Sequence, residues 1–264
     1  MNDSLVPRPA ATVMMLRNAD DGVEVLMLRR NLNSDFVGGA YVFPGGGVDA
    51  VDAQSSAEQM VAGIDDVSAS ARLGLASGGL AYYVACVREL FEEAGLLIAR
   101  HAEGNFIRFD EPSRTERFSE YRRQVNQRET RFLDVVANEK LQLDLGSLEY
   151  FAHWVTPVGP PRRYDTRFFV AVAPEAQTAA HDAGETVADT WVNPKEALAM
   201  HARGELEMIF PTIKNLENIA DCATANEVLD MARSLSDIPR IEPRIVNRNG
   251  QVAIVMPDEP GFND

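Results

Sequence analysis

Cysteine is scarce in this chain, whose 264 residues include only Cys86 and Cys222. Two cysteines form one disulfide at most, which excludes a small secreted module built on a disulfide framework. Long apolar runs are also missing, since no stretch approaches the roughly 18 residues that span a bilayer. The first residues lack the basic and apolar regions of a signal peptide. These absences favour a cytoplasmic protein with no membrane partner.

Basic residues are also fewer than acidic ones. The chain has 25 Lys and Arg against 40 Asp and Glu, so its formal charge is −15. Such a surface repels the phosphate backbone of nucleic acids, and no nucleic-acid partner is expected. A phosphorylated small molecule remains compatible with this charge if a metal ion supplies positive charge locally.

The order of strand-like and helix-like segments is typical of an α/β fold. Strand-like runs at 11–17 and 23–29 surround Asp20-Asp21-Gly22, which predicts a hairpin. Apolar residues recur with helical spacing over 79–98. The remaining expected elements are strands at 40–43, 150–155, 168–172 and 190–192, two helices within 112–144, a helix opening at Pro194, one or two helices after Pro211, and a hairpin of 244–246 with 252–255 through Asn249-Gly250.

Two boundaries follow from this order. Residues 51–79 are rich in Ala, Ser and Gly, which predicts a surface insertion with at most a short helix. We expect one principal domain at 1–206 and a helical and hairpin extension at 207–264 packed on it. The extension is expected to cap the core or to build a homodimer interface.

Three carboxylates carry the main chemical signal. Glu89, Glu92 and Glu93 stand at i, i+3 and i+4 of the predicted helix and therefore share one face. Converging carboxylate oxygens suit Mg²⁺ or Mn²⁺, which would offset the repulsion between the like charges. Arg88 is placed to pair with one carboxylate and hold its orientation. The alternative for three glutamates alone is a solvated acidic helix face.

The wider pattern resembles a known family. Residues 88–96, Arg-Glu-Leu-Phe-Glu-Glu-Ala-Gly-Leu, match the second half of the Nudix box, the signature of the Nudix hydrolases. Phe-Pro-Gly-Gly-Gly-Val-Asp at 43–49 is similar to the first half, with Gly46 as its opening glycine and Asp52 in the place of its early glutamate. The two halves stand 28 residues further apart than the family spacing, which matches the inserted segment.

A long insertion inside the box resembles one branch of the family, the coenzyme A diphosphatases and their bacterial relatives. Residues 39–46, 154–157 and 161–169 are also similar to that branch. One position departs from it: some coenzyme A hydrolases carry an arginine where this chain has Asp35.

The resemblance implies a fold, a reaction and a cofactor. The fold is a Nudix-type α/β/α sandwich with a mixed sheet. The reaction is hydrolysis of the pyrophosphate bond in a nucleoside diphosphate linked to a group X, with coenzyme A or an acyl-coenzyme A among the substrates considered. Glu92 and Glu93, assisted by Glu89 and the carbonyl of Gly46, would hold Mg²⁺ or Mn²⁺.

Catalysis also needs a base near the attacking water. In the family this base is the last box glutamate, here Glu93, or a loop carboxylate, for which Glu185 is the candidate. An exposed loop glutamate without a role is the alternative for Glu185.

Two arginine pairs are candidates for binding the substrate phosphates, Arg162 with Arg163 and Arg29 with Arg30. A structural salt bridge to Asp165 or a position at the surface is an equal alternative for the first pair. The same alternatives hold for the second pair, of which strand alternation turns one member away.

A second class of function stays open beside the enzyme. A Nudix module without catalysis would bind a nucleotide or a partner protein instead. All three box glutamates are present, which favours the hydrolase.

Overall fold

The computed structural model describes residues 5–32, 38–54, 57–182, 184–248, 251–260 and 262. Its centre is an eight-stranded sheet with the path β10-β2-β1-β9-β8-β11, to which β3 adds on β2 and β4 on β1. β1 runs parallel to β9 and antiparallel to β2, so the sheet is mixed. The strands are β1 (Arg8–Ala19), β2 (Gly22–Arg30), β3 (Tyr41–Val42), β4 (Gly45–Gly47), β8 (Glu149–Val155), β9 (Tyr164–Val172), β10 (Thr186–Val192) and β11 (Arg240–Ile241).

Both faces of this sheet are covered, as the alternation along β1 shows. Val13 and Met15 belong to a core cluster shared with helix α2 (Leu80–Ala94). Met14 and Leu16 belong to a second cluster, shared with the C-terminal helices. Successive strand side chains point to opposite faces, so one apolar strand supplies both cores. The expected α/β/α sandwich with a mixed sheet is confirmed.

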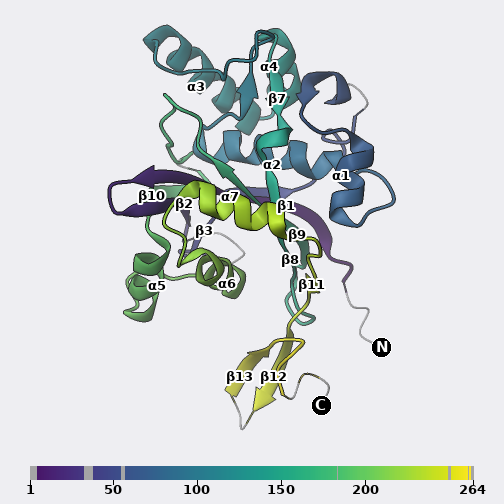
Figure 1. Cartoon of the computed structure of the whole chain (residues 1–264), viewed down its shortest axis with the longest axis vertical. Helices are drawn as coiled ribbons and strands as arrows, with labels where there is room; N and C mark the ends of the chain where they lie inside the picture. The colour runs from purple at the N-terminus through teal and green to yellow at the C-terminus, as the bar shows by residue number, and fades with distance from the viewer. Residues whose placement is uncertain are drawn as a thin grey trace.

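Figure 1 shows how the helices divide between the two faces. α1 (Asp66–Leu73), α2, α3 (Pro112–Asn126) and α4 (Phe132–Asn138) lie on one side of the sheet. α5 (Pro194–Ala202) and α6 (Phe210–Ile219) lie on the other side, and the buried face of α7 (Ala225–Ser234) joins the same cluster as α6. The two helices expected within 112–144 and the helix opening at Pro194 are therefore present.

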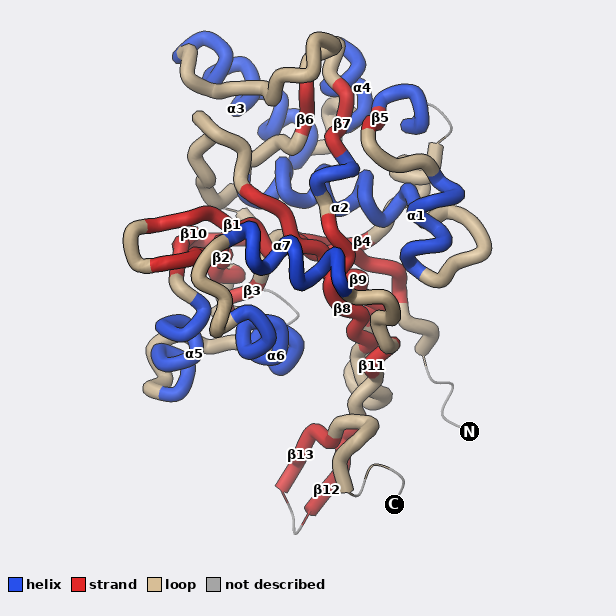
Figure 2. Tube along the Cα trace, viewed as in Figure 1, coloured by secondary structure: helices blue, strands red, loops and turns tan. Residues whose placement is uncertain are grey.

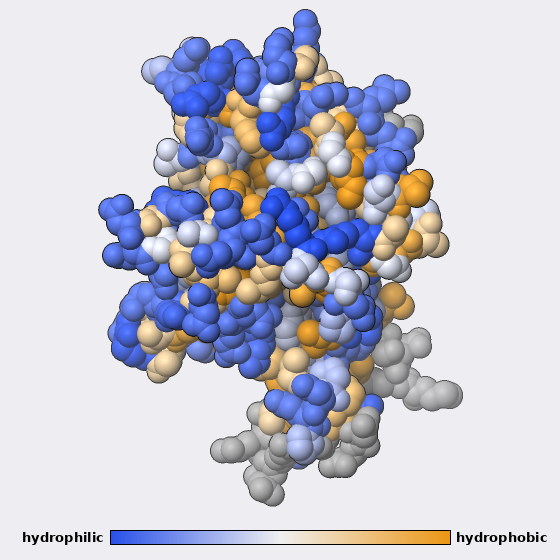
Figure 3. All heavy atoms as spheres, in the orientation of Figure 1, coloured by the Kyte–Doolittle hydropathy of each residue, from blue (hydrophilic) through white to orange (hydrophobic). Residues whose placement is uncertain are grey.

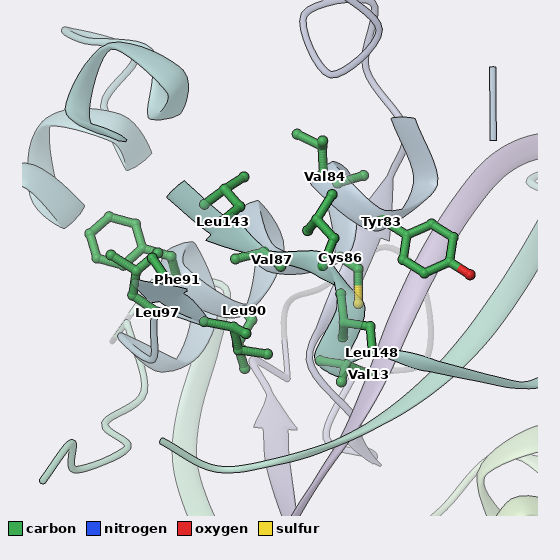
Figure 4. Packing of buried hydrophobic residues seen from close by; sticks show 14 of the residues in the cluster. Val13, Tyr83, Val84, Cys86, Val87, Leu90, Phe91, Leu97, Leu143 and Leu148 are labelled. Atoms are coloured by element: carbon green, nitrogen blue, oxygen red, sulfur yellow. The ribbon is translucent and has the colours of Figure 1, made fainter. Parts of the chain in front are cut away.

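Helix α2 is the best-buried element. Its side chains Val84, Val87, Leu90 and Phe91 pack together beneath the sheet, with Cys86 fully buried among them (Figure 4). Burial raises the pKa of the Cys86 thiol, which is typical of an inert packing cysteine. The helix ends within the expected span 79–98, at Ala94, with Gly95 as the expected terminating residue. Gly95 adopts a left-handed φ of 69° there, and its N–H bonds to Phe91 O.

The inserted segment is more deeply packed than the expected surface insertion. It contains the 3₁₀ helix η1 (Ala57–Met60), strand β5 (Val61–Ala62) and α1, and its Ala57 and Ala69 are buried in the core. β5 pairs with β7 (Gln142–Asp144), which also pairs with β6 (Ala99–Arg100); η2 (Leu145–Ser147) follows β7. Small side chains permit this docking, because the backbones of Gly63 and Gly146 touch.

The C-terminal residues contribute to the core and then leave it. Leu216 and Ile219 of α6 and Val228 of α7 are fully buried against the sheet. The last strands, β12 (Arg244–Arg248) and β13 (Gln251–Val255), form the expected hairpin, which projects beyond β11 in Figure 2. Its Asn249-Gly250 turn lies outside the described residues, as does Asp35. The boundary between 206 and 207 stays a prediction.

The surface view in Figure 3 shows a face made mostly of hydrophilic residues with scattered apolar ones. In the parts of the chain that the structure describes, none of the helices has the length and apolar character to cross a membrane.

Candidate active site

The site begins where the glycine strand β4 crosses α2. A Cβ atom at Gly46 would lie 2.5 Å from Oε1 of Glu89, so this strand passes directly against the carboxylate. The N–H of Gly45 donates a hydrogen bond of 2.8 Å to Oε2 of Glu93. The structure thus brings the two separated halves of the sequence motif together.

Arg88 locks the two halves in place. Its Nε and Nη2 each donate to the carboxylate of Asp52 at 2.9 Å, and Nη2 also donates to Gly47 O at 2.8 Å. Its Nη1 donates to Glu89 Oε1 at 2.8 Å. Burial opposes the charge of the guanidinium, but the Asp52 hydrogen bonds and the nearby carboxylates raise the pKa of Arg88. Asp52 lies at the start of the inserted segment 51–79 and Arg88 lies on the helix that follows it, so this ion pair ties the beginning of the insertion to α2.

The box carboxylates lie in an environment that disfavours their charge. Burial raises the pKa of Glu89 to about 7, with Arg88 opposing the shift and Glu92 adding to it. Glu93 is only 4 % exposed, and burial followed by the charge of Glu89 raises its pKa well above the usual range. Burial also raises the pKa of Glu92, which lies 3.5 Å from Arg88. Because Arg88 also pairs with Asp52, its positive charge only partly compensates the negative charge of the three glutamates.

This donor set fits a divalent cation. Among the residues described, no three His, Cys, Asp or Glu side chains already form a cation cluster. Glu89 nevertheless lies directly against Gly46, and buried carboxylates with raised pKa values gain most from a nearby positive charge. Carboxylate oxygens are the ligands that Mg²⁺ and Mn²⁺ prefer.

A cavity of about 600 Å³ opens over these groups, a size typical of a small-molecule site. It gathers six of the residues predicted for the site: Gly46, Glu89, Glu93, Arg30, Arg162 and Glu185. Arg88 and Glu92 are not among the described lining residues, but Arg88 donates to both Glu92 and the lining residue Glu89.

The loop before β10 carries Glu185 to the cavity. Nη2 of Arg30 lies 2.8 Å from Glu185 Oε1, which joins two of the predicted site residues in one ion pair. Asp182 organises this loop, since its carboxylate accepts from the N–H groups of Glu185 and Thr186 at 3.0 and 2.8 Å. Burial opposes the effect, but these hydrogen bonds lower the pKa of Asp182. Sequence reasoning missed Asp182, although an aspartate before Gly-Glu-Thr is a signal for such a turn.

Arg29 and Arg163 are the predicted phosphate ligands that do not reach the described cavity lining. Arg29 lies over the ring of Tyr41 and donates to Gly39 O at 3.4 Å, because alternation along β2 turns it away from Arg30. Arg163 is buried and ties three segments together through Leu5 O, Thr156 O and Glu242. These contacts favour a structural role for Arg163 over phosphate binding.

Asp165, considered as the ion-pair partner of Arg162 and Arg163, has His153 and Arg167 as partners among the described contacts. Asp165 Oδ1 accepts from His153 Nε2 at 2.7 Å and also pairs with Arg167. Burial works against the charge, but these contacts lower the pKa of Asp165.

Comparison with known proteins assigns the chain to a family. A family model described as the NUDT19 Nudix domain matches residues 65–219. The chain belongs to the NUDT19 Nudix family. This match begins inside the inserted segment and therefore covers the second half of the box. The position of the first half rests on the contacts of Gly46 and Asp52 described above.

Individual relatives of the NUDT19 Nudix family support the same assignment. Acyl-coenzyme A diphosphatase NUDT19 from Xenopus laevis is 26 % identical over 92 % of this chain and 72 % of its own length. The Homo sapiens protein of the same name is 26 % identical over 92 % and 74 %. A crystal structure of a Nudix hydrolase from Alicyclobacillus acidocaldarius is 28 % identical, covers 89 % of this chain and 99 % of its own, and superposes with a TM-score of 0.69.

These findings confirm the expected enzyme class. The chain is a Nudix pyrophosphohydrolase related to coenzyme A diphosphatases. Nudix hydrolases generally use divalent metal ions, in agreement with the chemistry of the carboxylates on α2.

Proposed function

We propose that this hydrolase splits the pyrophosphate bond of coenzyme A or an acyl-coenzyme A, using Mg²⁺ or Mn²⁺. The products would be adenosine 3′,5′-bisphosphate and phosphopantetheine or its acyl derivative. The observation that carries the proposal is the cavity in which Glu89, Glu93 and the β4 glycines form one wall. The names of the curated relatives support the coenzyme A part.

The cation would be held by Glu89, Glu92 and Glu93 with the backbone of Gly46 beside them. Bound there, it would neutralise the charge of the pyrophosphate and lower the pKa of the attacking water. Arg88 cannot replace it, since its guanidinium is committed to Asp52 and Gly47 O.

The residues of the chain supply orientation and a proton acceptor. Arg30 and Arg162 line the cavity and are the phosphate ligands we retain from the two predicted pairs. Two carboxylates are candidates for taking the proton of the water, Glu93 and Glu185, and both line the cavity. Glu185 is 55 % exposed at its side chain and pairs with Arg30, which fixes its orientation in the lining.

The test is a substrate panel with Mg²⁺ or Mn²⁺, in which products are identified by mass spectrometry. The panel holds coenzyme A, acetyl-coenzyme A, NADH, ADP-ribose, a diadenosine polyphosphate and a nucleoside triphosphate. We expect the coenzyme A species to be split, and Glu93→Gln to reduce turnover by at least about 100-fold with the fold retained. Arg29→Ala serves as the matched control, because that arginine does not line the cavity.

Hydrolysis of another member of the panel alone would overturn the coenzyme A assignment and leave the enzyme class intact. Equal activity of Glu93→Gln and the unaltered protein would overturn the role given to the carboxylates of α2.

A further inference from the structure

The cavity continues beyond the part that the pyrophosphate chemistry uses. At one end lie the β4 glycines and the carboxylates of Glu89 and Glu93. Across β1 and β9 from β4, the lining includes an apolar wall beside the polar Thr156, Tyr164 and Thr166; the wall consists of Trp154, Phe168, Ile209, Phe210, Pro243 and Ile254. A phosphate gains nothing from such a wall, so the apolar wall fits a different, uncharged part of the ligand.

Most of this apolar wall comes from residues after 206. Phe210 is the first residue of α6, and its ring meets Trp154 of β8 edge to face, with the ring centroids 6.0 Å apart. Pro243 and Ile254 belong to the C-terminal hairpin and the segment before it. The extension thus completes a cavity whose catalytic end is built from residues 10–93 and 185.

We propose that the C-terminal extension, through Phe210 and Ile254, binds the pantetheine–acyl arm of the substrate and sets the preference for acyl length. This inference rests on the proposed function and deepens it. The arm contains methyl and methylene groups beside its two amides and, in an acyl-coenzyme A, ends in a chain without polar groups that gains from apolar surface. An adenine instead carries hydrogen-bonding edges that an apolar wall leaves unpaired. The composition of the wall therefore favours the arm over the base.

The hairpin itself supplies a matched pair of variants. Ile245 and Ile254 face each other across β12 and β13 and are 41 % and 43 % exposed. Of the two, Ile254 is the one found among the described residues of the cavity lining. Ile254→Ser removes apolar wall from the cavity, and Ile245→Ser makes the same chemical change outside it.

The experiment measures kcat/KM of the full chain for coenzyme A, acetyl-, butanoyl- and octanoyl-coenzyme A. For the unaltered protein we expect kcat/KM to rise with acyl length, by up to about fourfold for each methylene that the wall covers. Ile254→Ser is expected to lose roughly four- to tenfold on the octanoyl substrate and less than about twofold on coenzyme A. Ile245→Ser is expected to change neither by more than about twofold.

Each other outcome overturns a specific part of the proposal. Equal losses on all four substrates for Ile254→Ser would assign the wall to a part that all four share, the pantetheine or the nucleotide, and would overturn its role in the preference for acyl length. Equal losses for the two variants would show that the hairpin acts through its own stability. A kcat/KM independent of acyl length would overturn the inference alone, whereas no turnover of any coenzyme A species would overturn the proposed function. Circular dichroism and thermal melts confirm that both variants fold.

Discussion

At the scale of single residues, the ion pair between Asp52 and Arg88 determines how the site is assembled. Asp52 is 1 % exposed and Arg88 7 % exposed at their side chains, and two hydrogen bonds of 2.9 Å join them. Removing one partner of a buried pair leaves the other charge without compensation. The position of the early glutamate of the box could be inferred from the sequence, but its deep burial could not, because 28 extra residues separate it from the helix.

We therefore expect Asp52→Ala to lower the free energy of unfolding by about 3–5 kcal/mol and to lower turnover as well. Asp49→Ala is the matched control, since Asp49 is 69 % exposed and 3.9 Å from the same guanidinium. Surface pairs contribute at most about 1 kcal/mol. Urea unfolding of both variants measures the difference, and comparable midpoints for the two would contradict this role of Asp52.

A second prediction at this scale concerns pH. Glu89 has a pKa of about 7 in the folded chain against an ordinary value of 4.5. The folded state therefore holds its proton more tightly than the unfolded state, and stability is lost as pH rises between about 4.5 and 7. The loss from this group amounts to roughly 3 kcal/mol. Glu93 shifts in the same direction.

Urea unfolding in the presence of a chelator tests this prediction. We expect Glu89→Gln to flatten much of the fall in stability between pH 5 and 8, because glutamine carries no charge to bury. Added Mg²⁺ or Mn²⁺ is expected to raise the stability of the unaltered protein more at pH 8 than at pH 5. A stability that increases with pH over this range would contradict the burial of these carboxylates.

At the scale of elements, the loop before β10 positions Glu185 through one side chain. Asp182 accepts from the N–H of Glu185 and from both the N–H and hydroxyl of Thr186. If Glu185 takes the proton of the water, Asp182→Ala is expected to lower kcat by about tenfold. This loss is smaller than the roughly 100-fold or larger loss that follows removal of the base itself, because the variant only misplaces Glu185. Asp189→Ala is the control, because Asp189 holds His181 instead. Steady-state kinetics distinguish the two variants, and equal kcat values would remove Asp182 from this role.

Elements with a strong hydrophobic periodicity could be predicted from the sequence, and most of the short ones, β3 excepted, could not. The apolar stripe of α2 and the β1–β2 hairpin lie where the pattern placed them, because each buries one continuous face. β5, β6, β7 and β11 are two or three residues long, which is too short to show alternation. The inserted segment was expected at the surface because it has few large side chains. It packs instead through alanine and glycine, whose small size allows close backbone contact.

At the scale of the whole molecule, the extension after residue 206 belongs to the core of the fold as much as to the cavity. Leu216, Ile219, Val228 and Ala232 are fully buried in the cluster that covers one face of the sheet. Each large apolar side chain of this kind contributes about 1.5–3 kcal/mol on burial, as an upper estimate. Their sum is comparable with the whole free energy of folding of a typical domain.

A chain ending at Leu206 is therefore expected to lose cooperative unfolding or to aggregate. A chain ending at Glu242 keeps α6, α7 and the Arg163–Glu242 pair, so it is expected to stay folded with a Tm within about 5 °C of the full chain. Because it lacks Ile254, it should lose the preference for long acyl arms but still split coenzyme A. Thermal melts, light scattering and kinetics of both truncations test this division of roles. A soluble, monomeric and fully active chain of 206 residues would show that the extension serves neither the core nor the cavity.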